Sequence, residues 1–353
     1  MPGLATGKVL VSGASGFIAA WVVRSLLEAG FSVRGTVRSE NKTVYLKKEF
    51  ASYGDAFELV VVPDIAAEGA FDEAVRGVDA VAHTASPFRL DAVDPDELIL
   101  PAIRGTVGML KSVLKHGSGV KRVVITGSCA SVIHADPEPK TFSEVDWNEQ
   151  SPKEVEEMGR ETPGMTKYFA SKTLAERAAW NFMKEYKSQM NWDLVVINPP
   201  FVFGPTIHDV TTPSMLNTST SHFFTMLTDP STSASSPLAT FRSGAAWIDV
   251  RDLGTAHVRA FQNEEAGGER IIVTEGSYVW QNFLDEAPEV SPKGLRYQKG
   301  ISGCDIEPPV VHHVQYDTRK AAKLLGIPVK SGYRSIGETV RDTVADWEAR
   351  GWV

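Results

Sequence analysis

Three residues in the middle of the chain carry side chains suited to moving a proton onto an oxygen. Tyr168 and Lys172 are four residues apart in a segment with helical periodicity, so they share one face. A free tyrosine has a pKa of about 10, and a neighbouring ammonium is expected to lower that pKa toward the working range. Ser128 follows an apolar run and could donate a hydrogen bond to a substrate oxygen that gains negative charge. The three residues therefore suit carbonyl reduction by hydride transfer.

A glycine-rich turn lies between the apolar run at 8–12 and a helical pattern at 17–29. Gly13 permits a tight turn, Gly16 lets backbone amides approach a pyrophosphate, and Ala19 lets the helix pack closely. An ordinary strand-to-helix loop is the alternative, but the strand before and the helix after favour dinucleotide binding. The turn residues expected to bind the cofactor are Gly13, Ser15, Gly16, Phe17 and Ile18.

The cofactor type follows from the end of the next strand, at 32–37. An acidic residue there would bind the ribose 2′-hydroxyl of NAD, but this chain has Arg38 with Lys42 nearby. A guanidinium matches the shape of the 2′-phosphate of NADP, so we predict NADPH. The alternative is that both residues are solvated surface charges.

Later strand ends offer further cofactor contacts. Asp64 follows a strand at 57–62, where adenine commonly lies, and a simple Pro-Asp turn is the alternative interpretation. His83 is expected to be a packed strand histidine. The small residues after it could adjoin the pyrophosphate and the nicotinamide ribose: Thr84, Ala85 and Ser86.

Short β-branched runs alternate with helical patterns, which predicts an α/β fold with a doubly wound parallel (Rossmann) sheet. A second helix is predicted at 166–186, and the Ser/Thr/Pro-rich stretch 211–240 is predicted to be loop. The expected strands are 8–12, 32–37, 57–62, 80–83, 122–126, 194–198 and 270–274. All the polar groups above then share the carboxyl edge of the sheet. We expect a dinucleotide-binding domain at 1–198 plus about 241–275, and a smaller, discontinuous C-terminal substrate lobe at about 199–240 plus 276–353.

Composition excludes several classes of function. The net charge of −8 disfavours nucleic acid, and no apolar run reaches the roughly 18 residues that span a bilayer. Two cysteines, Cys129 and Cys304, allow neither a four-cysteine metal site nor a disulfide framework. We therefore expect a cytoplasmic protein with no metal and no membrane or nucleic-acid partner. The sequence makes no prediction of the oligomeric state.

Together these residues resemble the extended short-chain dehydrogenase/reductase family, most closely its fungal NADPH-dependent methylglyoxal and carbonyl (aldehyde) reductases and more distantly dihydroflavonol reductases. The similarity rests on residues 13–19, 38 with 42, 62–65, 83–88, 128, 168 with 172, 198–205 and 247–252. The resemblance implies that Ser128, Tyr168 and Lys172 are catalytic. It also implies that Arg38 and Lys42 bind the 2′-phosphate, that Asp64 and Ile65 flank adenine, and that Pro199 and Val202 contact the nicotinamide end.

The resemblance further implies a mostly apolar pocket for an aldehyde or ketone. Its expected lining is Phe88, Cys129, Val132, Met165 and Phe201. The fungal methylglyoxal reductases tend to carry a bulky aromatic where this chain has Cys129, so we expect a wider pocket and bulkier carbonyl substrates than methylglyoxal.

Two alternatives remain at this point. Epimerases or dehydratases and hydroxysteroid dehydrogenases share the turn and the Tyr-Lys pair, but most of them use NAD, which Arg38 disfavours. A non-catalytic NADP(H) sensor would not need Tyr168 and Lys172.

Overall fold

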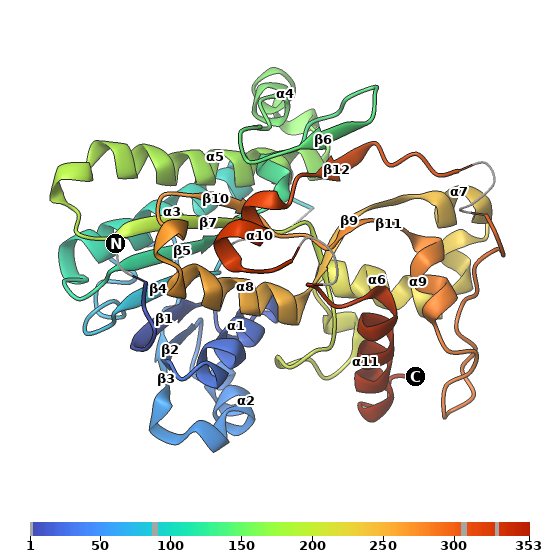
Figure 1. Ribbon diagram of the computed structural model, residues 1–353, viewed down its shortest axis with the longest axis horizontal. Helices are drawn as coiled ribbons and strands as arrows, with labels where there is room; N and C mark the ends of the chain where they lie inside the picture. Colours follow the sequence, from blue (N-terminus) through green and yellow to red (C-terminus); the bar gives the residue numbers. More distant parts are fainter. Residues whose placement is uncertain (1–2, 87–90, 305–308, 329–331) are drawn as a thin grey trace.

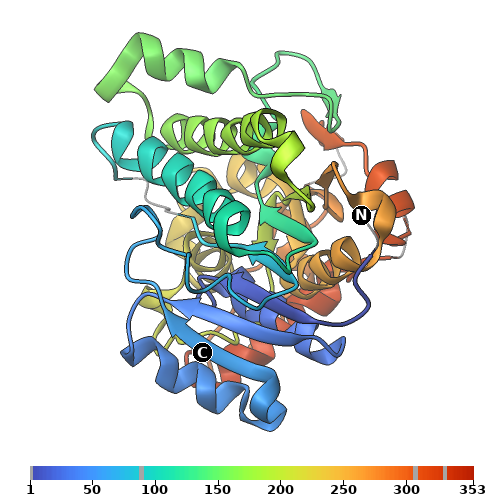
Figure 2. The same ribbon diagram turned by 90° about the vertical axis from the view of Figure 1, so that its left-hand side faces the viewer.

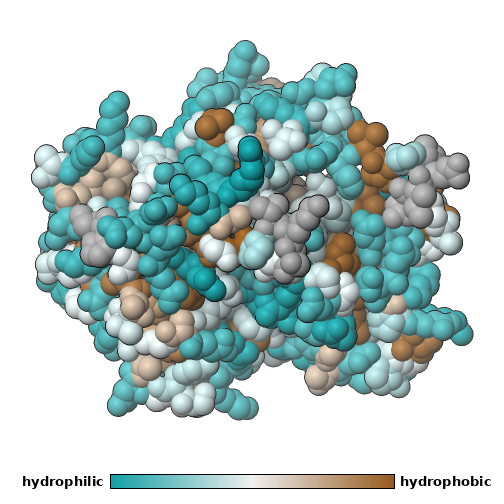
Figure 3. Space-filling model, in the orientation of Figure 1, coloured by the Kyte–Doolittle hydropathy of each residue, from teal (hydrophilic) through white to brown (hydrophobic). Residues whose placement is uncertain are grey.

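The computed structural model describes residues 3–86, 91–304, 309–328 and 332–353. A large strand-and-helix body lies beside a smaller group of helices and short strands (Figure 1). The face drawn in Figure 3 is mostly hydrophilic, with apolar residues in small groups, as on ordinary protein surfaces. Among the described residues, no helix is both long and apolar enough to cross a bilayer.

The large body is built on a seven-stranded sheet in the order β10-β7-β5-β4-β1-β2-β3, in which every neighbouring pair is parallel. The strands are β1 (Lys8–Ser12), β2 (Ser32–Val37), β3 (Phe57–Val61), β4 (Ala80–His83), β5 (Arg122–Thr126), β7 (Asp193–Asn198) and β10 (Arg270–Ile272). The predicted strands are confirmed, with ends that differ by at most two residues. The strand order reverses between β1 and β4, which is where ligands bind in open parallel sheets.

Helices cover both faces of this sheet (Figure 2). Helices α3 (Asp96–His116) and α5 (Gly164–Glu185) pack together on one face, and α1 (Phe17–Glu28) and α8 (Val250–Gln262) pack together on the other. Each layer has its own apolar core against the β-branched strand residues. The predicted doubly wound fold is therefore confirmed, and the helix expected at 166–186 is α5. Helix α2 (Asn41–Glu49) follows β2.

The smaller body contains a three-stranded sheet of β8 (Phe201–Phe203), β9 (Gly244–Asp249) and β11 (Gly276–Val279). An aromatic core holds its helices against this sheet; large members are Phe203, Phe223, Trp247, Trp280, Phe283 and Trp347. The helices are α6 (Thr218–Thr228), α7 (Pro237–Arg242), α9 (Trp280–Glu286) and α11 (Ile336–Ala349).

The prediction that 211–240 is loop was wrong, because α6 and most of α7 lie within it. Serine and threonine have weak helix propensity, so the local sequence of this stretch does not favour a helix. However, Phe223, Met226 and Leu227 are spaced i, i+3 and i+4 and are buried in the aromatic core. Tertiary packing of this apolar face outweighs the local preference.

The C-terminal segment returns to the large body after the smaller one. Strand β12 (Val314–Tyr316) pairs in parallel with β6 (Lys140–Phe142), which lies near α4 (Gln150–Met158) (Figure 1). Helix α10 (Arg319–Leu325) then packs on α8 and β10. Strand β9 pairs with β8 and β11, whereas α8 and β10 belong to the large body. The proposed domain boundaries stay a prediction.

Candidate active site

The three catalytic candidates meet at the carboxyl edge of the large sheet. Ser128 lies two residues beyond β5, and Tyr168 and Lys172 lie on successive turns of α5. The Lys172 ammonium is 5.9 Å from the centre of the Tyr168 ring, and a hydrogen bond joins the Ser128 and Tyr168 side chains. Lys172 Nζ also donates to Ser86 Oγ at 3.0 Å, so the loop after β4 reaches the same place.

The charge states of this group differ in part from the sequence-based expectation. Burial raises the pKa of Tyr168 to about 12, although its hydrogen bond with Ser128 acts in the opposite direction. The expected lowering of this pKa was wrong, because removal from water disfavours a phenolate more than the Ser128 hydrogen bond stabilises it. Burial also lowers the pKa of Lys172 to about 8, while the Glu176 carboxylate opposes that shift. At neutral pH the phenol keeps its proton and most Lys172 side chains are charged.

The glycine turn forms a cradle that fits a pyrophosphate. Gly13 has a φ of 67°, and a Cβ there would lie 3.0 Å from the Ala85 Cβ. Gly16 is the N-cap of α1, and no side chain caps this helix end. The first amides of α1 are therefore left for an anion, with the helix dipole favouring negative charge. Of the other turn residues, Phe17 is buried and Ser15 and Ile18 are half-buried.

Ser12, a residue that the sequence analysis missed, fixes the loop beside this cradle. Its hydroxyl oxygen accepts from the amides of Thr84 and Ala85, each at 3.0 Å, and lies 2.9 Å from His83 Nδ1. Burial lowers the pKa of His83 to about 3, so the ring is neutral and Nδ1 can accept the Ser12 proton. His83 is a packed strand residue, as the sequence suggested. A small polar residue at the end of β1 was the only sequence signal for Ser12.

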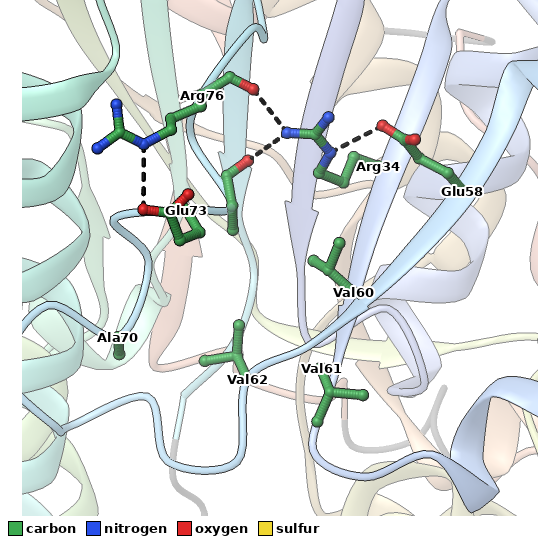
Figure 4. Close-up of a pocket in the computed structure, with 9 residues that line it drawn as sticks. Arg34, Glu58, Val60, Val61, Val62, Ala70, Glu73 and Arg76 are labelled. Atoms are coloured by element: carbon green, nitrogen blue, oxygen red, sulfur yellow. Dashed lines mark hydrogen bonds and ion pairs between the residues drawn. The ribbon is translucent and has the colours of Figure 1, made fainter.

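The two arginines of the second strand and its end have different surroundings. Arg34 donates to Glu58 at 2.7 Å and to the carbonyls of Ala74 and Arg76 at 2.9 and 2.7 Å, at the rim of a hollow of about 320 Å³ (Figure 4). Arg38 is exposed, and no described residue pairs with it. Arg38 is therefore available to an anion, whereas Arg34 is occupied by protein groups.

Lys42 is not free in the same way. Its ammonium lies 3.1 Å from Asp209 Oδ2, in the loop that follows β8. Both side chains are partly exposed, so a phosphate near Lys42 would compete with a weak ion pair.

The other predicted cofactor contacts have mixed surroundings. Asp64 is exposed and accepts from the Ala66 amide at 2.9 Å, which is the turn geometry considered as its alternative. Ile65 packs against α3, where a Cβ on Gly105 would lie 3.3 Å from its side chain. Pro199 and Val202 are buried at the start of the chain's path into the smaller body. Their cofactor roles stay predictions.

The expected substrate-pocket residues are not gathered at one open surface. Met165 is 43% exposed, and Phe201 is half-buried and stacks on Phe203 at 6.1 Å. Cys129 and Val132 lie in a small core with Phe142 and Ile272. Phe88 lies outside the described residues.

Cys129 is deeply buried, and its thiol donates to the Asn198 carbonyl at 3.2 Å. Burial raises the pKa of this thiol well above its usual value, so it is a poor nucleophile. A hollow of about 540 Å³ in the smaller body is lined by α6, α7 and Trp280, and its described lining includes none of the catalytic candidates.

Similarity to known proteins extends over most of the chain. The model of the family described as "NAD dependent epimerase/dehydratase family" matches residues 9–274. The chain is 34% identical over 353 residues to the NADPH-dependent methylglyoxal reductase GRE2 of Saccharomyces cerevisiae, covering 96% of this chain and 97% of that protein. It is 34% identical over 338 residues to the ketoreductase azaE of Aspergillus niger, covering 94% and 96%.

A solved structure gives the same result. The crystal structure of yeast methylglyoxal/isovaleraldehyde reductase Gre2 complexed with NADPH superposes with a TM-score of 0.81 at 32% identity, covering 98% of this chain and all of that one. The resemblance predicted from the sequence is therefore confirmed. The chain belongs to the NAD dependent epimerase/dehydratase family, that is, the extended short-chain dehydrogenases/reductases.

Proposed function

We propose that the chain reduces aldehydes and ketones to alcohols with NADPH, with Tyr168 as the proton donor. One observation carries the proposal: Ser128, Tyr168 and Lys172 meet beside an uncapped glycine turn at the same sheet edge. The chain is an NADPH-dependent oxidoreductase. Its relative GRE2 of yeast is named an NADPH-dependent methylglyoxal reductase. NADPH, when bound, supplies the hydride.

The residues divide the remaining work between them. Ser128 hydrogen-bonds the substrate oxygen as negative charge grows on it. Tyr168 donates its proton to that oxygen, so the carbonyl gains a hydride on carbon and a proton on oxygen. A pKa of about 12 keeps the phenol protonated until this moment. The nearby Lys172 ammonium then stabilises the phenolate that forms, and its three donors suit the nicotinamide ribose.

The amides of the glycine turn hold the pyrophosphate, and Arg38 with Lys42 binds the 2′-phosphate. The exposure of Arg38 and its lack of a partner among the described residues support this assignment. The uncapped N-terminus of α1 and the tight turn at Gly13, whose φ is positive, support the dinucleotide itself.

The substrate is an apolar aldehyde or ketone with a group bulkier than that of methylglyoxal. The partly exposed, apolar side chains of Met165 and Phe201 support an apolar substrate, and the preference for a bulkier group follows from the sequence position of Cys129 alone. A cytoplasmic location remains a proposal, with which two buried thiols that form no disulfide, Cys129 and Cys304, accord.

The test is loss of NADPH absorbance when the purified protein meets a panel of methylglyoxal, aromatic aldehydes and bulky ketones. We expect one alcohol formed per NADPH consumed, with the bulkier carbonyls turned over faster. NADPH binding without consumption would indicate the sensor. Interconversion of a nucleotide sugar without net NADPH loss would indicate the epimerase.

A further inference from the structure

A buried ion pair lies directly behind the catalytic group. Glu176 is on α5, one turn beyond Lys172, and is 3% exposed. Its Oε1 accepts from Arg270 Nε at 2.6 Å, and its Oε2 accepts from Asn198 Nδ2 at 2.9 Å and from the Ser131 hydroxyl. Glu176 extends the four-residue spacing of Tyr168 and Lys172, and the sequence analysis missed it.

The partners of Glu176 hold the turn that carries Ser128. Asn198, the last residue of β7, donates from Nδ2 to the Ser128 carbonyl at 3.0 Å. The Ser131 hydroxyl lies 2.8 Å from the same carbonyl and 3.1 Å from Asn198 Nδ2. Asn198 and Ser131 are fully buried. The Glu176 carboxylate therefore orders two side chains that both contact the backbone of Ser128.

Arg270 offsets the free-energy cost of removing the Glu176 carboxylate from water. Its guanidinium donates to the carbonyls of Glu144 and Asp146 at 2.8 and 2.9 Å and lies 3.6 Å from the centre of the Trp147 ring. A buried carboxylate without such a partner would shed its charge by taking up a proton. Arg270, at the start of the edge strand β10, is thus the buried positive charge that pairs with Glu176.

Glu176 also acts on Lys172 through charge. The two side chains share one helix face, and the carboxylate opposes the effect of burial on the ammonium. Among the residues that the structure describes, the other titratable groups placed near Lys172 are Tyr168 on the same helix and His83 on β4. His83 is neutral and Tyr168 is protonated across the working range. Of these groups, only Glu176 therefore carries a negative charge that raises the pKa of Lys172.

We propose that Glu176 is a positioning residue, which holds the Ser128 turn through Asn198 and Ser131 and places a negative charge one helical turn from Lys172. The inference rests on the proposed reductase function, but its test is separate. If the unaltered enzyme consumes no NADPH with any carbonyl, the proposed function fails. If the unaltered enzyme is active and the variants below behave like it, only this inference fails.

The decisive variant is Glu176→Gln, which keeps the shape and removes the charge. We expect kcat to fall about tenfold while the KM for NADPH changes less than about twofold. The alkaline limb of the kcat profile should move to lower pH by about one unit, because Lys172 loses the nearby anion. Glu176→Asp, which retains the charge, should restore the limb toward its original position. A limb that stays in place in Glu176→Gln would overturn the proposal.

The matched control is Glu149→Gln. Glu149, at the start of α4, is paired with Arg177 of α5 but is largely exposed, so its loss should leave kcat and the pH profile unchanged. Glu176→Gln leaves Arg270 buried without its partner and could therefore prevent folding. If Glu176→Gln does not fold, the double variant Glu176→Gln/Arg270→Gln, which removes both charges, tests the proposal instead. A shifted limb in the folded double variant supports the proposal, and an unshifted limb refutes it.

Discussion

The two ends of the cofactor site are built differently. At the catalytic end, Tyr168 and Lys172 are held by protein groups, and burial shifts both pKa values. At the phosphate end, Arg38 is exposed and has no partner among the described residues. The first end is organised before any ligand arrives, whereas the second is completed by its ligand. Changes at the catalytic end should therefore alter kcat, and changes at the phosphate end should alter KM.

The largest effect should come from the catalytic end. Tyr168→Phe removes the proton donor and should lower kcat by about two orders of magnitude or more. NADPH binding, measured by fluorescence titration, should be nearly unchanged. Tyr186→Phe, at the other end of α5, is the control and should keep full activity. Normal turnover by Tyr168→Phe would assign the acid role to another residue.

At the phosphate end, Arg38→Ala should raise the KM for NADPH by about tenfold or more, the size of a lost charged hydrogen bond. The KM for NADH should barely change. Arg34→Ala is the matched control, because Arg34 is bound to Glu58 and two carbonyls. It should lower the Tm without changing the ratio of the two KM values. Equal losses for both cofactors in Arg38→Ala would remove the assignment.

The pH dependence should separate the two ends again. Because burial lowers the pKa of Lys172 to about 8, its ammonium is present below that pH and lost above it. Tyr168, with a pKa of about 12, remains protonated over the same range. The kcat for reduction should therefore be level near pH 7 and about tenfold lower per pH unit well above 8. A level profile to pH 10 would contradict the role given to Lys172.

The smallest effect should come from the Lys42–Asp209 ion pair. Asp209→Asn frees Lys42 and removes a negative charge near the expected phosphate, so the KM for NADPH should fall about two- to threefold. Steady-state kinetics at low salt would measure this change. Glu269→Gln, from a similarly exposed pair with Lys320 at the far edge of the sheet, should have no such effect. A raised KM in Asp209→Asn would show that Asp209 helps to hold the site.

The residues show why sequence reasoning succeeded in one body more than in the other. Strands of the large sheet are buried on both faces, so each is a continuous β-branched run that can be read locally. Helix α6 has a Ser/Thr-rich sequence and forms because Phe223, Met226 and Leu227 meet an aromatic core assembled from distant segments. The pocket role of Cys129 was similarly hard to judge, because Phe142 and Ile272 enclose it from other parts of the chain.

The sequence by itself determined the parallel sheet, the glycine turn, and the Tyr168 and Lys172 face of one helix, because each depends on neighbours a few residues apart. The tertiary structure alone decided the charge states and the support of the site. Burial outweighed the hydrogen bond from Ser128 in setting the Tyr168 pKa. Glu176 forms its ion pair with Arg270, which lies 94 residues further along the chain in β10. Desolvation and such pairings depend on which distant segments enclose a group, and that information exists only once the chain has folded.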